Sequence, residues 1–177
     1  LANRTPAPHG GGMSQDQLQF LGAARTVTGS KFLVTTPDAT VLVDAGVYQG
    51  PRELRERNWE DLPVRPGDID AVVLTHAHID HCGYVPRLVK QGFTGTVYAT
   101  HRTVDLARIV LPDSGHLNEE EAAYRARHRA SRHNPPLPLY TEDDAHRALT
   151  QFEGQPYGEL FEVAPGVSIK FHRAGHI

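Results

Sequence analysis

Short apolar runs, separated by turn-forming residues, dominate the first part of the chain. Residues 19–22, 31–35 and 40–44 are rich in apolar and β-branched side chains, which is typical of short strands. Pro37 and Asp38 lie between the second and third of these runs, and such a pair favours a turn. The pattern therefore predicts one strand followed by a hairpin of two more.

The most apolar run covers residues 71–75 and is almost uninterrupted. A run of this kind is typical of a strand that is buried on both faces. Short helices are expected at 52–59 and at 85–91, the second with a proline in its first turn and a glycine after its end. Residues 95–99 return to a strand pattern.

The pattern becomes helical from His101 onward. Pro112 is expected to kink or divide this helical stretch, because proline lacks the backbone N–H and crowds the preceding turn. Thr141 is expected to cap a further helix that continues to about Phe152, with acidic residues in its first turn.

Two more strands are predicted at 159–163 and 167–172, around a Pro-Gly turn. Strands come first and mixed helices and strands follow, which fits a layered α/β sandwich. With 177 residues, 39% of them hydrophobic, the chain is long enough for one domain with a core. We expect residues 1–17 to form a disordered extension ahead of a domain at 18–177.

The net charge is −3, with 18 Lys and Arg against 21 Asp and Glu, so the composition does not indicate a basic nucleic-acid-binding surface. The single cysteine, Cys82, excludes an intramolecular disulfide and is expected to pack as a small apolar residue. No apolar run approaches the roughly 20 residues that span a bilayer. A cytoplasmic protein without a membrane partner is expected.

Residues 75–81, directly after the buried strand, read Thr-His-Ala-His-Ile-Asp-His. His76 and His78 project to the same side if the backbone is extended, while Asp80 and His81 would turn toward a neighbouring position. Imidazole and carboxylate suit Zn²⁺ and also tolerate Mn²⁺ or Fe²⁺. Two such ions about 3.5–4 Å apart would share a water and clamp an attacked phosphoryl or carbonyl group. Surface histidines at a strand end are the alternative, which four ligand-type residues in so short a segment disfavour.

This segment resembles the HxHxDH signature of the metallo-β-lactamase superfamily. Residues 42–46 resemble the upstream Asp motif of that superfamily, and residues 174–177 resemble its next His motif. Three other segments resemble the β-CASP branch, which includes ribonuclease J and the endonuclease subunit of the mRNA 3′-end cleavage factor; they are residues 21–30, 49–50 and 111–116. The resemblance implies an α/β fold of the αββα sandwich type.

The resemblance also implies two zinc ions, with manganese or iron as alternatives, held by His76, His78 and His176 for the first ion and by Asp80 and His81 for the second. Asp44 would orient the site by hydrogen bonding, because a carboxylate can fix the tautomer of a ligating imidazole. Asp44 and Asp80 are thus the side chains expected to assist catalysis. The nucleophile would be a metal-bound hydroxide.

The family pattern continues with a bridging Asp, a final His and the β-CASP cap, and no segment of these 177 residues matches them. We therefore expect an incomplete sandwich that alone binds one metal ion weakly or not at all and cleaves RNA poorly. For the complete enzyme the implied function is metal-dependent hydrolysis of single-stranded RNA in RNA processing or decay, and a homodimer is compatible with it. The alternatives are a hydrolase of a small thioester or lactone and a non-catalytic interaction module.

Two further features are candidates for the site. Gly29 and Ser30 are expected to form a tight loop near the metals, where backbone N–H groups would meet a phosphate. His116 is a candidate for contact with the substrate or with a neighbour of the metal site.

Overall fold

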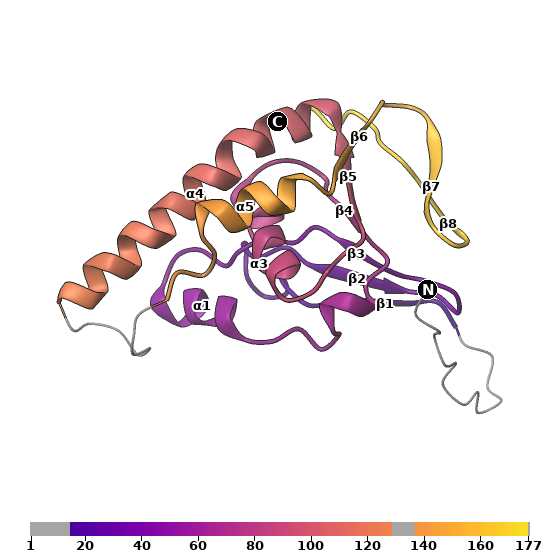
Figure 1. Cartoon of the computed structure of the whole chain (residues 1–177). Helices are drawn as coiled ribbons and strands as arrows, with labels where there is room; N and C mark the ends of the chain where they lie inside the picture. Colours follow the sequence, from indigo (N-terminus) through magenta and orange to yellow (C-terminus); the bar gives the residue numbers. More distant parts are fainter. Residues whose placement is uncertain (1–14, 129–136, 177) are drawn as a thin grey trace.

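A computed structural model describes residues 15–128 and 137–176 of the chain (Figure 1). Most of the expected N-terminal extension, residues 1–14, lies outside the described residues. Strand β1 begins at Gln17, so the ordered fold starts within the segment that was expected to precede it. Among the described helices, none is long and apolar enough to cross a membrane.

A six-stranded mixed sheet forms the centre of the molecule, in the order β1-β2-β3-β4-β5-β6. The strands β1 to β3 pair antiparallel, and β3 to β6 pair parallel. Their bounds are β1 Gln17–Phe20, β2 Phe32–Thr35, β3 Thr40–Val43, β4 Ala71–Val73, β5 Thr96–Thr100 and β6 Phe152–Gln155. The predicted hairpin of β2 and β3 is confirmed, and β4 is buried along its whole length, as its apolar sequence predicts.

Helices cover one face of the sheet (Figure 1). The main core lies between this face and the helices, and it includes Val72 of β4, Leu88 of α3, Leu111 of α4 and Ala148 of α5. The helical segments are α1 Arg52–Glu56, η1 Arg57–Trp59, η2 Pro66–Asp68, α2 Ile79–Cys82, α3 Val85–Lys90, α4 His101–Arg127 and α5 Glu142–Leu149. One helical layer thus packs on the sheet, as an α/β sandwich requires.

The other face carries a smaller apolar cluster and the hairpin of β7 Leu160–Ala164 and β8 Val167–Lys170. Val41 and Val73 of the large sheet pack here with Val163 of the hairpin. The edge strand β1 is exposed along its length, with Phe20 60% exposed. The two predicted C-terminal strands and the turn between them are confirmed.

Two predictions about the second half are corrected in part. Of the two outcomes expected at Pro112, division of the helical stretch does not occur, because α4 is a single helix from His101 to Arg127. Proline removes one backbone hydrogen bond, and burial of α4 residues on both sides of it, at Ala107 and Gly115, outweighs that loss. The last predicted helix, which Thr141 caps as expected, ends at Leu149, and the following residues form β6 beside β5.

Candidate metal centre

The metal-type cluster lies at the carboxyl end of β4, beside the carboxyl end of β3. These two strands are parallel, so the residues that follow them, Asp44 and the segment 74–78, meet at one edge of the sheet. A hydrogen bond from Asp44 N–H to Val73 O, at 2.8 Å, fixes the two strand ends side by side. The topology therefore brings together two motifs that are thirty residues apart in the sequence.

Asp44 is a buried hub of hydrogen bonds, with only 2% of the residue exposed. Its Oδ1 accepts bonds from the Thr75 N–H at 2.8 Å and from Thr75 Oγ1 at 2.9 Å. Its Oδ2 accepts bonds from His81 Nδ1 at 2.7 Å and from Ser30 Oγ at 3.3 Å. The Asp44 φ of +57° lies in the left-handed region, which aspartate tolerates better than most residues. One carboxylate thus ties three segments of the site together.

The Thr75 hydroxyl connects Asp44 to His76. A hydroxyl has one proton, so while it donates to the Asp44 carboxylate it accepts the proton of His76 Nδ1, 2.9 Å away. His81 likewise donates its Nδ1 proton to Asp44. Both rings thereby carry a proton on Nδ1, so Nε2 is the nitrogen with which each ring, in its neutral form, would bind a metal ion.

Three imidazoles, those of His76, His78 and His176, lie close together near Asp44 and Thr75. The ligating atoms of His76, His78 and His176 all lie within 4.8 Å of one another. Within residues 15–128 and 137–176, no other group of three such side chains is this close. The His81 ring lies 4.0 Å from the His76 ring, and its Nε2 is 3.8 Å from Asp80 Oδ2. Asp80 and His81 are therefore neighbours of the group of three.

The pKa values of His76 and His81 are shifted in opposite directions. Burial lowers the pKa of His76, and the neighbouring His81 lowers it further. The hydrogen bond to the Asp44 carboxylate raises the pKa of His81. His76 is therefore held in the neutral form that binds a metal ion, whereas an ion at His81 has to displace a proton that Asp44 stabilises.

The donor set fits a transition-metal ion. Neutral imidazole nitrogens with a nearby carboxylate are the ligands that zinc, manganese and iron share in hydrolases. The Nδ1 atoms of His76 and His81 are hydrogen-bonded to Thr75 Oγ1 and Asp44, which satisfies the requirement that ligating imidazoles be oriented through their other nitrogen.

The structure adds one residue to this picture and narrows one expectation. Thr75 had no role assigned from the sequence, although its place between the buried strand and His76 was the available signal. The loop at Gly29 and Ser30 was expected to offer backbone N–H groups to a phosphate. Of these, the Ser30 N–H is already engaged, because it donates to the Asp80 carbonyl at 2.9 Å.

The remaining candidates lie outside the cluster. His116 is exposed on α4, and its ring nitrogens face Glu120 at 3.6 Å and Glu142 at 3.9 Å. Cys82 is fully buried in the main core, as expected. Burial raises the pKa of its thiol to about 12, which leaves it uncharged and unsuited to bind a metal ion.

The chain is similar to known proteins in sequence and in fold. The family model described as the metallo-beta-lactamase superfamily matches residues 25–166. Ribonuclease TTHA0252 of Thermus thermophilus is 37% identical over 156 residues, which are 88% of this chain and 32% of that protein. The transcription termination factor FttA of Methanocaldococcus jannaschii is 31% identical over 161 residues, which are 91% of this chain and 23% of that protein. The chain thus matches only 23–32% of the length of these relatives.

Among solved structures, the metallo-beta-lactamase SMB-1 bound to 2-mercaptoethanesulfonate aligns with a TM-score of 0.50 and 21% identity, over 89% of this chain and 50% of that one. This likeness concerns the fold. The parallel strand ends, the imidazole cluster that they carry and the match over most of the chain lead to one conclusion: the chain belongs to the metallo-beta-lactamase superfamily.

Proposed function

We propose that this chain carries the metal-binding part of a β-CASP-type ribonuclease that hydrolyses phosphodiester bonds of single-stranded RNA. The imidazole group of His76, His78 and His176, backed by Asp44, is the observation that carries the proposal. The relatives named as a ribonuclease and as a transcription termination factor, which resemble nearly all of this chain, support RNA as the substrate.

Two zinc ions, or manganese or iron in their place, are the expected cofactors. His76, His78 and His176 would hold the first ion, and Asp80 and His81 would contribute to the second. When bound, the ions supply Lewis acidity, which lowers the pKa of a water and neutralises charge that develops on the attacked phosphoryl group.

The side chains of this chain prepare that chemistry. Asp44 accepts the Nδ1 proton of His81, and through Thr75 it fixes the Nδ1 proton of His76. Both imidazoles then keep their orientation without reorganising during the reaction, which is the condition for efficient electrostatic catalysis. Asp80, 23% exposed beside His81, is the carboxylate available to face a water or substrate.

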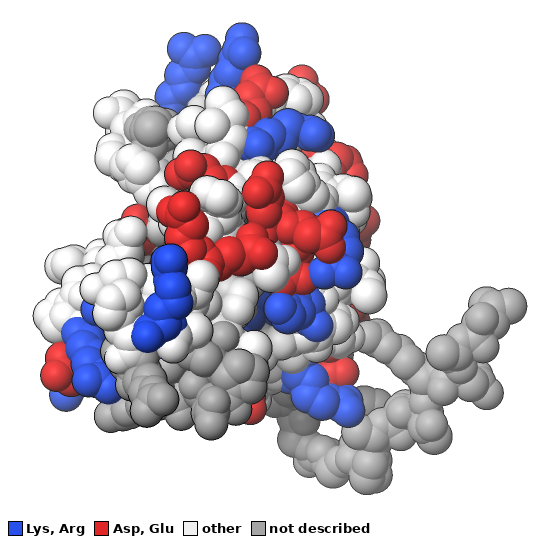
Figure 2. Space-filling model, turned by 60° about the vertical axis from the view of Figure 1, so that its left-hand side comes forward, with Lys and Arg blue, Asp and Glu red and all other residues white. Residues whose placement is uncertain are grey.

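The surface charge limits where RNA binds. On the face shown in Figure 2, acidic side chains gather in the middle, and Lys and Arg form separate groups around them. A phosphate backbone is held by a continuous basic strip, so this face is unsuited to it. Several arginines are also neutralised by glutamates, such as Arg125 with Glu121 at 2.5 Å. We therefore infer that RNA does not bind along the middle of this face.

The test is a cleavage assay of the protein as its gene encodes it, with 5′-labelled single-stranded RNA, duplex RNA and small thioester or lactone substrates. We expect zinc-dependent cleavage of single-stranded RNA that His76→Ala reduces at least 100-fold. His146→Ala, which replaces an exposed histidine of α5 that lies 3.6 Å from Glu142, is the matched control and should cleave normally. Hydrolysis of the small esters without RNA cleavage, or full activity of His76→Ala, would contradict the proposal.

A further inference from the structure

Lys31 is a buried lysine directly after the loop that contacts the metal centre. Only 2% of the residue is exposed. Its Nζ donates a hydrogen bond to the Gly46 carbonyl and lies over two aromatic rings, 4.7 Å from the centre of Tyr48 and 4.6 Å from the centre of Tyr84. An ammonium has three N–H donors, and here one carbonyl and two ring faces surround it. Lys31 is thus held in one place by its polar head as well as by its alkyl chain.

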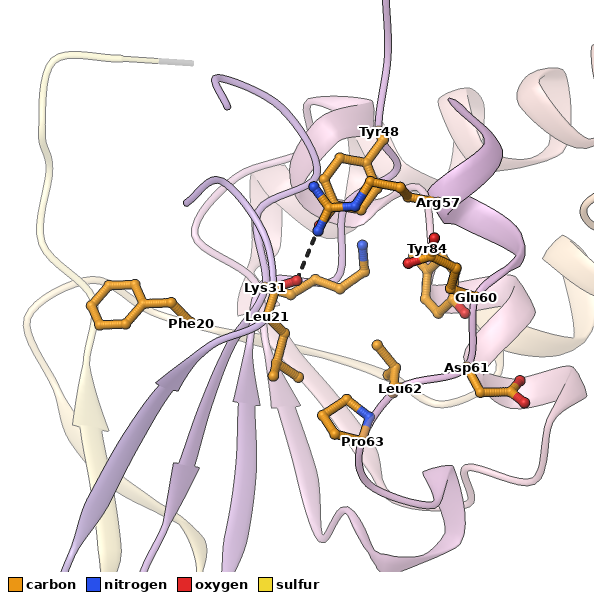
Figure 3. A pocket seen from close by; sticks show the side chains of 10 residues that line it. All are labelled: Phe20, Leu21, Lys31, Tyr48, Arg57, Glu60, Asp61, Leu62, Pro63 and Tyr84. Carbon is orange, nitrogen blue, oxygen red and sulfur yellow. Dashed lines mark hydrogen bonds between the residues drawn. The ribbon is translucent and has the colours of Figure 1, made fainter. Parts of the chain in front are cut away.

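The ammonium group faces a cavity of about 260 Å³ that is drawn in Figure 3. Arg57 lies over the Tyr48 ring, with its guanidinium carbon 4.3 Å from the ring centre. Burial lowers the pKa of Lys31 to about 7, and the charge of Arg57 contributes to the same shift. Two carboxylates, Glu60 and Asp61, complete the charged lining. Burying this amine is therefore costly, and the cost has to be offset by the contacts that its head group makes.

Gly46, which accepts the Lys31 hydrogen bond, packs against the backbone of the metal-binding segment. A Cβ atom on Gly46 would lie 1.6 Å from the Asp80 carbonyl oxygen, so the two backbones are in direct contact. The Gly46 N–H donates to Ser30 O at 2.9 Å, and the Ser30 N–H donates to Asp80 O at 2.9 Å. The neighbouring Ala45 N–H donates to the carbonyl of His81 at 2.7 Å.

These bonds join three segments, residues 29–31, 44–47 and 79–82, into one backbone unit, which we name the ladder. Asp44 begins its middle segment in a left-handed conformation that its surroundings have to maintain. The Lys31 ammonium anchors the Gly46 carbonyl, two residues after Asp44. Loss of this anchor would let the middle segment move relative to Asp80 and His81.

We propose that Lys31 is a positioning residue of the metal centre, which acts by holding the Gly46 carbonyl and, through the ladder, the placement of Asp44 against Asp80 and His81. The inference rests on the proposed metal-binding role of the cluster. The Lys31 ammonium contacts the Gly46 carbonyl and the rings of Tyr48 and Tyr84, none of which is a proposed ligand, so its effect on the site would be transmitted by the backbone. A lysine that merely fills space in the core would leave the ladder and the metal affinity unchanged when replaced by a side chain of the same shape.

The experiment compares Lys31→Met, Lys31→Arg and the control Lys90→Met, in which the lysine lost is the partner of Asp144 on α5. Amide hydrogen exchange is measured without metal, and Co²⁺ affinity is measured by visible absorption. For Lys31→Met we expect at least 10-fold faster exchange at Ser30, Gly46 and Ala45, unchanged exchange at Val72 and Val97 in the sheet, and roughly 10-fold weaker Co²⁺ binding. Lys31→Arg should recover part of both effects, and Lys90→Met should retain the wild-type Co²⁺ affinity.

Equal loss of protection in the ladder and in the sheet, or unchanged Co²⁺ affinity in folded Lys31→Met, overturns the proposal. If wild-type protein binds no Co²⁺ at all, the metal-site proposal fails, while the exchange data still decide the role of Lys31.

A measurement on the wild-type chain covers the case in which Lys31→Met does not fold. Lys31, Lys90 and Lys170 are the lysines of the sequence, so their ¹⁵N ammonium signals are distinguishable. Only Lys31 should give a slowly exchanging signal at pH 6, and a rapidly exchanging one would refute the anchor.

Discussion

Replacing Asp44 by asparagine tests the hydrogen-bonding hub of the site. Asparagine tolerates the left-handed conformation and keeps one carbonyl oxygen for the Thr75 N–H, so the backbone should be preserved. The amide group would place an N–H donor where Oδ2 now accepts the Nδ1 proton of His81 at 2.7 Å. Two donors cannot face each other, so the His81 ring has to move its proton to Nε2, the atom that the metal ion needs.

The magnitude follows from the contacts that are lost. A hydrogen bond to a charged group contributes about 1.5–3 kcal/mol, and removal of the partner that orients a ligating histidine weakens metal binding roughly 10- to 100-fold. We therefore expect Asp44→Asn to bind Zn²⁺ weaker by that factor, which corresponds to about 1.4–2.7 kcal/mol.

The assay is competition for Zn²⁺ against a chromophoric chelator, combined with long-range ¹H–¹⁵N correlation spectra of the histidine rings without metal. In the wild-type protein the spectra should show His81 with its proton on Nδ1, and in the variant with its proton on Nε2. Asp105→Asn, an exposed aspartate on α4 whose side chain lies 3.3 Å from Arg102, is the matched control. Zinc affinity of Asp44→Asn within twofold of wild type, with the ring proton still on Nδ1, would refute the reasoning.

Three further predictions concern the same elements. Thr75→Val should weaken zinc binding roughly 10-fold in the same competition assay, whereas Thr75→Ser keeps the hydroxyl and the affinity; equal loss in both would show that the hydroxyl is irrelevant. Gly46→Ala should lower the free energy of unfolding by about 3 kcal/mol in urea, followed by Trp59 fluorescence, since the added Cβ would overlap the Asp80 carbonyl; a variant as stable as the wild type would rule out this close contact. Burial alone would raise the pKa of Asp144, but hydrogen bonds from Lys90 and from the helix cap lower it to about 2. This carboxylate therefore contributes about 2 kcal/mol of stability that is present above pH 4 and is lost as the pH falls toward 2. Asp144→Asn should remove that pH dependence in acid unfolding, and an unchanged acid transition would contradict it.

The sequence predicted the elements whose information is local. The apolar run at 71–75 marked the buried strand β4, the Pro-Asp pair marked the β2–β3 hairpin, and Thr141 marked the start of α5. It also placed the cluster at a strand end, because the ligand-type residues directly follow the run. Each of these features depends on residues adjacent in sequence, where propensity and periodicity act.

Features that depend on partners distant in sequence escaped this reasoning. Strand β6 contains a glycine and polar residues, and it is a strand because β5 offers it a parallel partner. The roles of Thr75 and Lys31 arise from contacts with Asp44 and Gly46, which neither local pattern indicates. The sequence likewise did not indicate that the Ser30 N–H donates a hydrogen bond to the carbonyl of Asp80, fifty residues away.

The central claim, that His76, His78 and His176 together hold a metal ion, is tested most directly by crystals grown with Zn²⁺ and measured on both sides of the zinc absorption edge. The anomalous difference map should show an ion bound to nitrogens of all three imidazoles, at the roughly 2.0–2.1 Å typical of zinc–histidine bonds. Zinc found elsewhere on the protein, with these three rings unliganded at saturating Zn²⁺, would contradict the account.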